Sequence, residues 1–204
     1  MNPVFVEGNL LPEPVEKEKK NMKILTTPIE GLLEIYPIIF EDNRGYFFES
    51  FKKKDLILHG VEKEWVQENQ SFSKKGTVRG LHFQHAPFAQ AKLARVLKGK
   101  VLDVVVDLRK GSLTYGVVYT KILDDIRHNM LYVPEGFAHG FSVLEDAVFS
   151  YRCSNYYNKS SEGGVIWNDP QLAIDWQVDF PLLSDKDEEL PTFEEFTQMT
   201  KGGI

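Results

Sequence analysis

The sequence predicts an all-β fold, a sandwich or a barrel, with short helical segments only towards its C-terminal end. Three observations carry this prediction. Short runs of aliphatic, β-branched and aromatic residues recur through most of the chain. Turn-forming residues separate these runs at close intervals, and neither an internal repeat nor a low-complexity block interrupts the pattern. The length of 204 residues suits one domain with a substantial core.

The composition is that of a globular protein and argues against several classes of function. The net charge is −6, and no stripe of lysine and arginine is interleaved with aromatic residues, so we expect no nucleic-acid partner. The single cysteine, Cys153, excludes an internal disulfide, and its strand-like setting predicts an inert buried thiol. Without a signal-peptide pattern or an apolar run of membrane-spanning length, the sequence predicts a cytoplasmic protein with no membrane contact.

We expect one domain between two tails. Residues 1–22 contain three prolines and a run of five charged residues, which predicts a disordered N-terminal tail. Residues 23–197 carry the strand pattern and form the predicted domain. Residues 198–204 are expected to be a C-terminal tail.

The first half of the domain predicts four strands. Pro37 marks the first of them as an edge strand, and the segment Lys52–Gly60 suits a short helix or a loop. In the third strand, Gln67, Asn69 and Ser71 share one face. The predicted strands are Leu32–Phe40, Tyr46–Phe51, Trp65–Phe72 and Thr77–Gln84.

The second half continues with short strands and ends in a helical segment. A hairpin is predicted around Lys98-Gly99-Lys100. Ser184 and Asp187 have the spacing of a capping box, which predicts a helix start and gives Asp187 the ordinary role of a helix-terminus carboxylate. The predicted strands are Leu93–Leu97, Val101–Leu108, Tyr115–Leu123, Met130–Val133, His139–Leu144 and Ala147–Asn155.

The strand Thr77–Gln84 contains the most informative polar residues. Strict alternation places His82 and Gln84 on one face and Arg79, with a leucine and a phenylalanine, on the other. A histidine and a glutamine opposite large apolar side chains indicate either a polar pocket inside a sheet or a structural histidine on a solvated face. Both interpretations stay open at this point.

The polar residues suit proton transfer better than the other common chemistries. His82 and His85 are three residues apart and face opposite sides of a strand, so we expect no catalytic metal. Neither a glycine-rich phosphate loop nor a Gly-x-Ser-x-Gly elbow is present. What remains is a set of acids and bases, which by itself is weak evidence for proton-transfer catalysis. Its members are Arg44, Arg79, His82, Lys92, Asp103, His139, Tyr151, Tyr157 and Asp187.

An ordered series of motifs carries a resemblance to a known family. The motifs are Gln67–Ser71, Arg79–Gln84, Gln90–Leu93, Gly99–Val104, Asp107–Arg109, Pro134–Phe141, Tyr151, Asn155–Tyr157 and Trp167–Pro170. From about Ile29 to about Glu195 the chain resembles the dTDP-4-dehydrorhamnose 3,5-epimerases, the RmlC-type branch of the cupin superfamily. Each motif alone is modest, whereas the ordered set is specific.

The resemblance implies a cupin jelly-roll β-barrel, a homodimer that exchanges N-terminal strands, and neither metal nor cofactor. The implied substrate is dTDP-4-dehydro-6-deoxyglucose, which is inverted at C3 and C5 on the way to dTDP-L-rhamnose. The C4 ketone acidifies the hydrogens on both neighbouring carbons, because the carbanion delocalises onto oxygen as an enolate. Inversion then requires a base on one face, a proton donor on the other and positive charge near the oxyanion.

Four residues match the family's catalytic positions. His82 resembles the base, and Asp187 resembles its orienting partner, with Asp185 as a rival for that role. Tyr151 resembles the acid on the opposite face. Lys92 resembles the cation beside the enolate oxygen; without the resemblance it would be a solvated lysine at a strand end.

Seven further residues resemble substrate contacts. Arg79 matches the arginine at the diphosphate, although strict alternation aims it away from His82. Either Gly80 marks a kink or bulge, or one of the two roles is wrong. The implied contacts are Arg44 and Glu49 from the partner's exchanged strand, with Gln67, Asn69, Arg79, His139 and Tyr157 from the same subunit.

The same residues leave other activities open. A relative that inverts only C3 or only C5, or that uses another nucleotide-linked 4-keto sugar, would keep the same histidine, tyrosine and lysine. A ketoisomerase, which would shift the carbonyl group, fits less well because Tyr151 matches the acid of the epimerases. A non-catalytic cupin that binds a sugar nucleotide would lack the base and the acid, and both positions are filled here.

Overall fold

The structure, a computed structural model, describes residues 5–7 and 22–204. Strands account for 42% and helices for 11%, which confirms the all-β fold. The strands are β1 (Phe5–Glu7), β2 (Lys23–Thr26), β3 (Leu33–Tyr36), β4 (Phe40–Asp42), β5 (Gly45–Phe47), β6 (Gln67–Ser73), β7 (Val78–Gln84), β8 (Lys92–Asp107), β9 (Val118–Asp124), β10 (Met130–Val133), β11 (Phe137–Cys153) and β12 (Glu162–Gly164). The helices are α1 (Lys53–Ile57), α2 (Asp185–Glu188) and α3 (Phe193–Thr200). Within the described ranges, no helix is long and apolar enough to cross a membrane.

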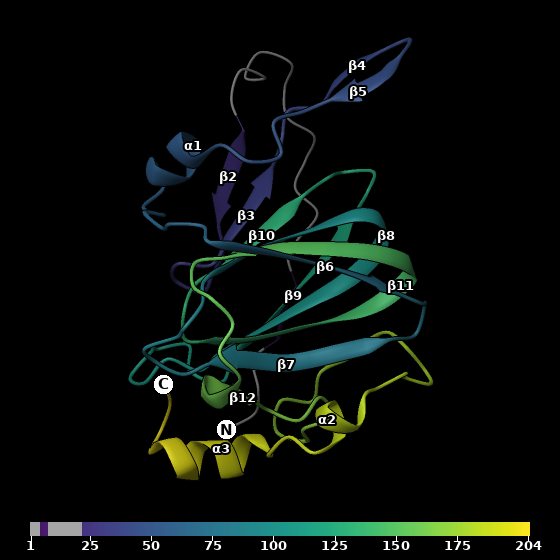
Figure 1. Cartoon of the computed structure of the whole chain (residues 1–204). Helices are drawn as coiled ribbons and strands as arrows, with labels where there is room; N and C mark the ends of the chain where they lie inside the picture. The colour runs from purple at the N-terminus through teal and green to yellow at the C-terminus, as the bar shows by residue number, and fades with distance from the viewer. Residues whose placement is uncertain (1–4, 8–21) are drawn as a thin grey trace.

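A ten-stranded sheet folds into a barrel of two layers (Figure 1). The long strands β8 and β11 pair with each other and pass from one layer into the other. In the first layer, the first half of β11 lies between β7 and the second half of β8, and β9 follows β8. In the second layer, the second half of β11 lies between β6 and the first half of β8, followed by β10, β3 and β2.

The predicted hairpin around Gly99 is wrong, because the chain does not reverse there. β8 continues through this position and stays paired with β11, with Val96 opposite Phe149 and Val101 opposite Val143. Gly99 has φ +83°, and a Cβ at this position would lie 2.1 Å from a backbone oxygen of β11. Glycine therefore bends the strand between the two layers where the sequence pattern indicated a turn.

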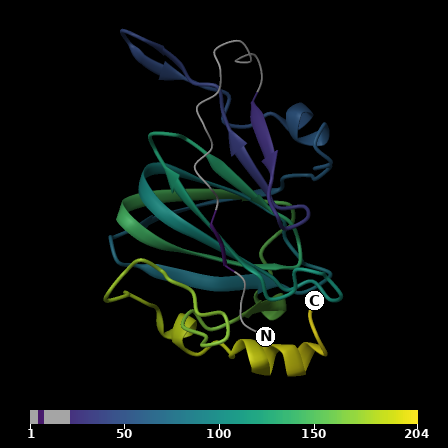
Figure 2. The same cartoon turned by 180° about the vertical axis from the view of Figure 1, so that it is seen from behind.

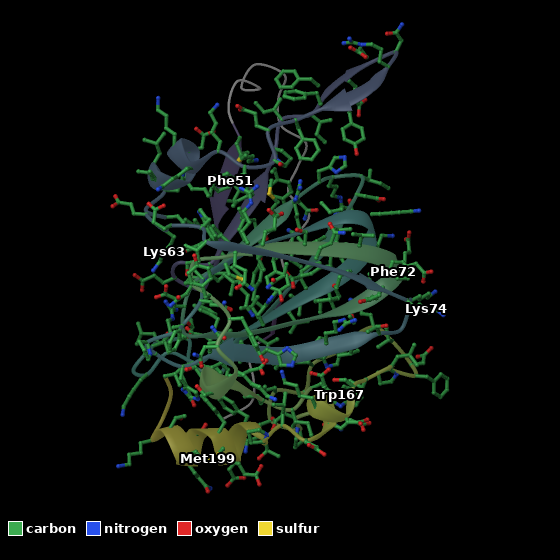
Figure 3. All side chains as sticks on the ribbon, in the orientation of Figure 1. Phe51, Lys63, Phe72, Lys74, Trp167 and Met199 are labelled. Carbon is green, nitrogen blue, oxygen red and sulfur yellow. The ribbon has the colours of Figure 1, made fainter. Side chains whose placement is uncertain are left out.

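Two of the three buried apolar clusters in the described part of the chain lie on the two sides of the first layer. One fills the interior between the layers and includes Val105 and Phe149. The other covers the outer face of the first layer, where Leu81 and other strand residues pack against the C-terminal segments. Trp167, which is labelled in Figure 3, packs against this outer cluster. The C-terminal part of the chain therefore forms a cover beneath β7, as Figure 1 shows.

The last residues of the chain are packed against the barrel rather than forming a tail. A capping box between Thr192 and Glu195 starts α3, which buries Phe196 and leaves Met199 on its outer side (Figure 3). The helix crosses the expected boundary at residue 198. Beyond it, the backbone N–H of Ile204 donates to the Leu108 carbonyl at 2.9 Å, so the C-terminus extends the pairing of β8.

The β4–β5 hairpin projects away from the barrel as a separate two-stranded sheet (Figures 1 and 2). Its strand residues are all exposed, and Phe40, Tyr46 and Phe47 are 57%, 59% and 67% accessible. At the base of the hairpin, Phe48 stacks on His128 and Tyr46 packs against the same ring at a tilt, with ring centres 4.6 and 4.7 Å away. The hairpin therefore presents three large apolar side chains at the surface of the single chain.

Part of the expected N-terminal tail is described. Phe5–Glu7 form β1, which pairs with β9 in parallel, so these residues extend the first layer. The other residues of the tail, 1–4 and 8–21, lie outside the described part of the chain. The barrel proper begins at β2, next to the expected boundary of the domain.

Candidate active site

A bulge in β7 brings Arg79 and His82 onto the same face. Arg79 is opposite Phe141 and His82 is opposite His139. The two β7 residues are three positions apart in the sequence, whereas their partners on β11 are two positions apart. Residues directly opposite each other share a face, and the two β11 residues lie on one face. The extra residue in β7 therefore reverses its alternation, which corrects the prediction that Arg79 and His82 point apart.

Glycine makes this bulge possible. Gly80 has φ +132°, and a Cβ there would lie 2.6 Å from the Cα atom of Gly140 on β11. The two backbones approach so closely that neither glycine has room for a side chain. Of the two explanations that the sequence left open, the bulge at Gly80 is the one that the structure contains.

His82 is paired with a buried carboxylate. Its Nε2 atom lies 2.6 Å from Asp187 Oδ1, and the Asp187 side chain is only 5% exposed. Ser184 Oγ donates to the other carboxylate oxygen at 2.7 Å, as the N-cap of α2. Burial would raise the pKa of Asp187, but the hydrogen bonds from His82 and Ser184 outweigh it and lower the pKa. The rival residue Asp185 is exposed.

A second histidine–carboxylate pair lies beside the first, on the neighbouring strands. His139 Nε2 lies 2.6 Å from Asp103 Oδ1, and both side chains are buried. Asp103 Oδ2 has no hydrogen-bond partner within the described part of the chain. Both residues belong to the set of acids and bases that the sequence offered, and the structure joins them.

Lys92 and Tyr151 stand on the second layer of the barrel. Lys92 Nζ donates to the His82 carbonyl at 3.4 Å and lies 5.8 Å from the centre of the Tyr151 ring. Burial lowers the pKa of the Lys92 ammonium group, and the charge of Asp103 is among the effects that oppose this shift. Burial also raises the pKa of the Tyr151 phenol, and the neighbouring Asn69 side chain opposes part of this shift. Tyr151 is therefore protonated at neutral pH and can donate.

The amides predicted to contact substrate are joined to each other. Gln67 Nε2 donates to Asn69 Oδ1 at 2.9 Å, and the Tyr157 backbone N–H donates to Gln67 Oε1 at 3.0 Å. The Tyr157 hydroxyl donates to Glu162 Oε2 at 3.1 Å. These contacts bring Gln67, Asn69 and Tyr157 to the same end of the barrel.

Glu162 is a residue of this region that the sequence did not indicate. It lies on β12, opposite Gln84 of β7, and Lys186 forms an ion pair with it. Burial would raise the pKa of Glu162, but the Lys186 contact and the nearby charge of His82 lower it. None of the ordered motifs covers this position, so only the pairing of β12 with β7 reveals it.

The predicted nucleotide contacts are divided between two places. Arg79 lies at the barrel and donates from Nε to Ser73 Oγ at 3.0 Å. Arg44 instead lies on the turn of the projecting hairpin, 86% exposed and paired with Asp42 (Figure 1). Glu49 follows this hairpin and pairs with Lys52 at 2.9 Å. Neither Arg44 nor Glu49 contacts His82 within the described residues.

A cavity also lies apart from the candidate catalytic residues His82, Lys92, Tyr151 and Asp187. It has a volume of about 380 Å³ and lies along the outer part of β6, where Phe51, Trp65 and Arg152 are among its lining residues. Of the predicted site residues it contacts only Gln67. Over the described ranges, no three His, Cys, Asp or Glu side chains are grouped to hold a metal ion.

Comparisons with known proteins find similar sequences and similar solved structures. The sequence profile of a family described as dTDP-4-dehydrorhamnose 3,5-epimerase matches residues 26–195. A protein of that name from Shigella flexneri is 46% identical over 168 residues, covering 81% of this chain and 93% of the relative. The crystal structure of such an epimerase from Elizabethkingia anophelis NUHP1 is 47% identical, with a TM-score of 0.82 over 86% of this chain and 98% of its own.

A solved structure with a narrower activity is also similar. ChmJ from Streptomyces bikiniensis, a 3'-monoepimerase in complex with dTDP-quinovose, is 35% identical with a TM-score of 0.80. The alignment covers 85% of this chain and 89% of ChmJ. The cupin-like barrel is thus common to relatives that differ in the number of carbons they invert.

Proposed function

The chain belongs to the dTDP-4-dehydrorhamnose 3,5-epimerase family, and on this premise we propose that it converts dTDP-4-dehydro-6-deoxy-D-glucose to dTDP-4-dehydro-L-rhamnose. One observation carries the proposal beyond the family relationship. The His82–Asp187 pair on one layer of the barrel faces the layer that carries Lys92 and Tyr151. This arrangement supplies a base, a cation and an acid around one space.

His82 removes the proton from the carbon next to the ketone. Its Nε2 atom is occupied by Asp187, which leaves Nδ1 to accept the proton. The ionised Asp187 carboxylate stabilises the imidazolium that forms and fixes the plane of the ring. Because Asp187 is buried and also bonded by Ser184, it holds one position throughout the reaction.

Lys92 stabilises the enolate, and Tyr151 completes the inversion. Negative charge develops on the sugar O4 atom when the proton leaves, and an ammonium group in a buried site opposes that charge more effectively than in water. The Tyr151 phenol then donates its proton to the same carbon from the opposite side. Repetition at the second carbon gives the double inversion, without a step that consumes a cofactor.

We also propose that the enzyme is a homodimer in which each hairpin completes the partner's site. The exposed aromatic residues of β4–β5 support this, as does the place of Arg44 in the turn between these two strands, which project from the barrel. In such a dimer Arg44 and Glu49 bind the nucleotide of the partner, while Arg79 binds the diphosphate. A cytoplasmic location is part of the proposal, supported by the single cysteine.

Incubation with dTDP-4-dehydro-6-deoxy-D-glucose in heavy water tests the reaction. We expect deuterium at both C3 and C5 of the product, because each new C–H bond takes its hydrogen from an enzyme group that exchanges with solvent. NMR of the recovered sugar nucleotide measures both positions in one sample. If deuterium were missing at C3, at C5 or at both, the proposed double inversion would be refuted.

A single-site epimerase is the second candidate, favoured by the similarity to the 3'-monoepimerase ChmJ. The same experiment separates the two, because a single-site enzyme would label one carbon alone. A binding protein without activity would label neither carbon while still retaining the nucleotide sugar.

Co-expression of two inactive variants tests the exchanged hairpin. His82→Asn disables the base of its own subunit, and Arg44→Ala removes the nucleotide contact offered to the partner. In a mixed dimer one site then combines an intact His82 with an intact Arg44. Random pairing makes about half of the dimers mixed, so about one quarter of wild-type activity should return.

The control is the mixture of separately purified variants that have not exchanged subunits, which should stay inactive. If Arg44 served its own subunit, no site in the mixed dimer would be complete. Activity no higher than the average of the two variants would therefore contradict the exchange.

A further inference from the structure

A histidine joins the projecting β4–β5 hairpin to the barrel. His128 lies in the turn between β9 and β10, and its ring stacks on Phe48 with ring centres 4.6 Å apart. Tyr46 packs against the same ring at a tilt, with ring centres 4.7 Å apart. Tyr46 and Phe48 also stack with each other, and His128 is only 6% exposed. The three rings therefore form one packed contact between the hairpin and the barrel.

The other contacts of the hairpin leave its direction open. In the described part of the chain, the hydrogen bonds and ion pairs of residues 40–49 stay within residues 40–52. One arm of the hairpin is anchored at Tyr36, which donates to Glu34, and the other at Phe51, which packs on Trp65 (Figure 3). Two anchored ends still allow a hairpin to rotate about the line that joins them. A third contact is required to fix its direction, and His128 supplies it.

The turn that carries His128 is itself held by side chains. The Asp124 carboxylate accepts two backbone N–H groups of the turn, at 3.1 and 2.6 Å. The Asn129 side chain donates to the Ile122 carbonyl at 2.8 Å. His128 has φ +51°, a left-handed conformation in which histidine is enriched and bulky apolar residues are rare. Histidine thus provides a flat ring that this backbone conformation accepts.

We propose that His128 is a positioning residue for the nucleotide site of the partner subunit. Neighbouring residues of a strand point to opposite faces, so Tyr46 and Phe47 lie on opposite sides of β5. By holding Tyr46 and Phe48 against its own barrel, His128 leaves Phe47 and Arg44 turned outward, 67% and 86% exposed. In the proposed homodimer, this direction is the one that carries Arg44 to the partner's nucleotide.

The effect of losing the ring follows from the populations of the hairpin. Without the contact to His128, the hairpin would divide its time among several directions, of which one is competent to bind. The apparent affinity of a site falls by the fraction of molecules that are competent. A saturating ligand selects the competent direction, so the chemical step is unaffected. The Kd of dTDP and the KM of the sugar nucleotide should rise while kcat stays constant.

His128→Asn tests this role, because asparagine accepts the left-handed conformation but has no ring. We expect the Kd of dTDP, measured by calorimetry, and the KM to rise about ten-fold with kcat unchanged, as the loss of two aromatic contacts predicts. Ile126→Ala is the matched control: this residue of the same turn is 78% exposed, and its change should leave both constants unaltered. His128→Phe keeps a ring at the cost of backbone strain, so it should restore the affinity while lowering the melting temperature.

A mixed dimer shows whether His128 acts on the partner. His128→Asn and His82→Asn are co-expressed with two different affinity tags, and purification on both tags isolates the dimers that contain one subunit of each. The working base then lies in the His128→Asn subunit, whose site receives the intact hairpin of the other subunit. We expect this site to have the wild-type KM. A KM as high as that of the His128→Asn homodimer would place the effect in its own subunit and overturn the inference.

The inference rests on the proposed epimerisation and hairpin exchange, and its failure is distinguishable from theirs. A wild-type protein that neither exchanges deuterium nor binds dTDP would overturn the proposed function. An active wild-type enzyme with an unchanged Kd in His128→Asn would overturn only the role of His128, as would a loss of stability without a change in affinity. Should His128→Asn fail to fold, Phe48→Leu removes the other ring of the stack. It should also raise the Kd, and a wild-type value there would contradict the inference.

Discussion

Replacing His82 with asparagine is expected to lower the rate of epimerisation by about a thousand-fold, because the side chain loses the group that accepts the proton. The fold should survive this change. Asparagine can still donate an N–H to Asp187, so the buried carboxylate keeps a hydrogen-bond partner. Steady-state turnover and deuterium exchange should fall together, since both begin with the same proton abstraction.

Two measurements control this prediction. Binding of dTDP to His82→Asn, measured by calorimetry, should stay within a few-fold of wild type because the nucleotide contacts lie elsewhere. His59→Asn is the matched variant: His59 is an exposed histidine after α1, and its change should leave the rate unaltered. A His82→Asn enzyme with near-wild-type turnover would remove this residue from the mechanism.

Replacing Tyr151 with phenylalanine is expected to separate proton removal from inversion. The phenol oxygen is lost while the ring remains, so the packing against Phe149 and the contact with Lys92 are retained. His82 can still take the proton and return it to the same face. We expect inversion to fall by about a hundred-fold while exchange of deuterium into recovered substrate continues.

The ratio of these two rates is the decisive measurement. Tyr156→Phe provides the control, since Tyr156 is 63% exposed and lies outside the catalytic cluster. Its exchange and inversion should both match wild type. If Tyr151→Phe lost exchange and inversion to the same extent, the phenol would have no specific role as the second acid.

The sequence provided candidate catalytic residues but not their geometry. His82 and Asp187 were expected as partners, but the local pattern could not choose between Asp187 and Asp185. The choice depends on how α2 packs beneath β7, and the two elements are over 100 residues apart in the chain. Tertiary packing of this kind leaves no local signature.

The bulge at Gly80 shows a second limit of structure prediction from the sequence alone. Strict alternation is a property of a regular strand, and the extra residue becomes visible only when β7 is aligned with β11. Gly99 misled the prediction for a related reason, because a glycine between two strand-like runs suits both a turn and a bend. Glu162 was missed because its place depends on the pairing of β12 with β7.

The two-layer construction of the barrel also has a consequence for the choice of sugar. His82 is carried by one wall and Tyr151 by the other, and stacked sheets lie about 10 Å apart. Under the proposed mechanism, the pyranose ring lies between His82 and Tyr151 with one broad side towards each wall. A bulky substituent that stands upright from the ring would then meet one of the two walls, so we expect sugars of that kind to be poor substrates.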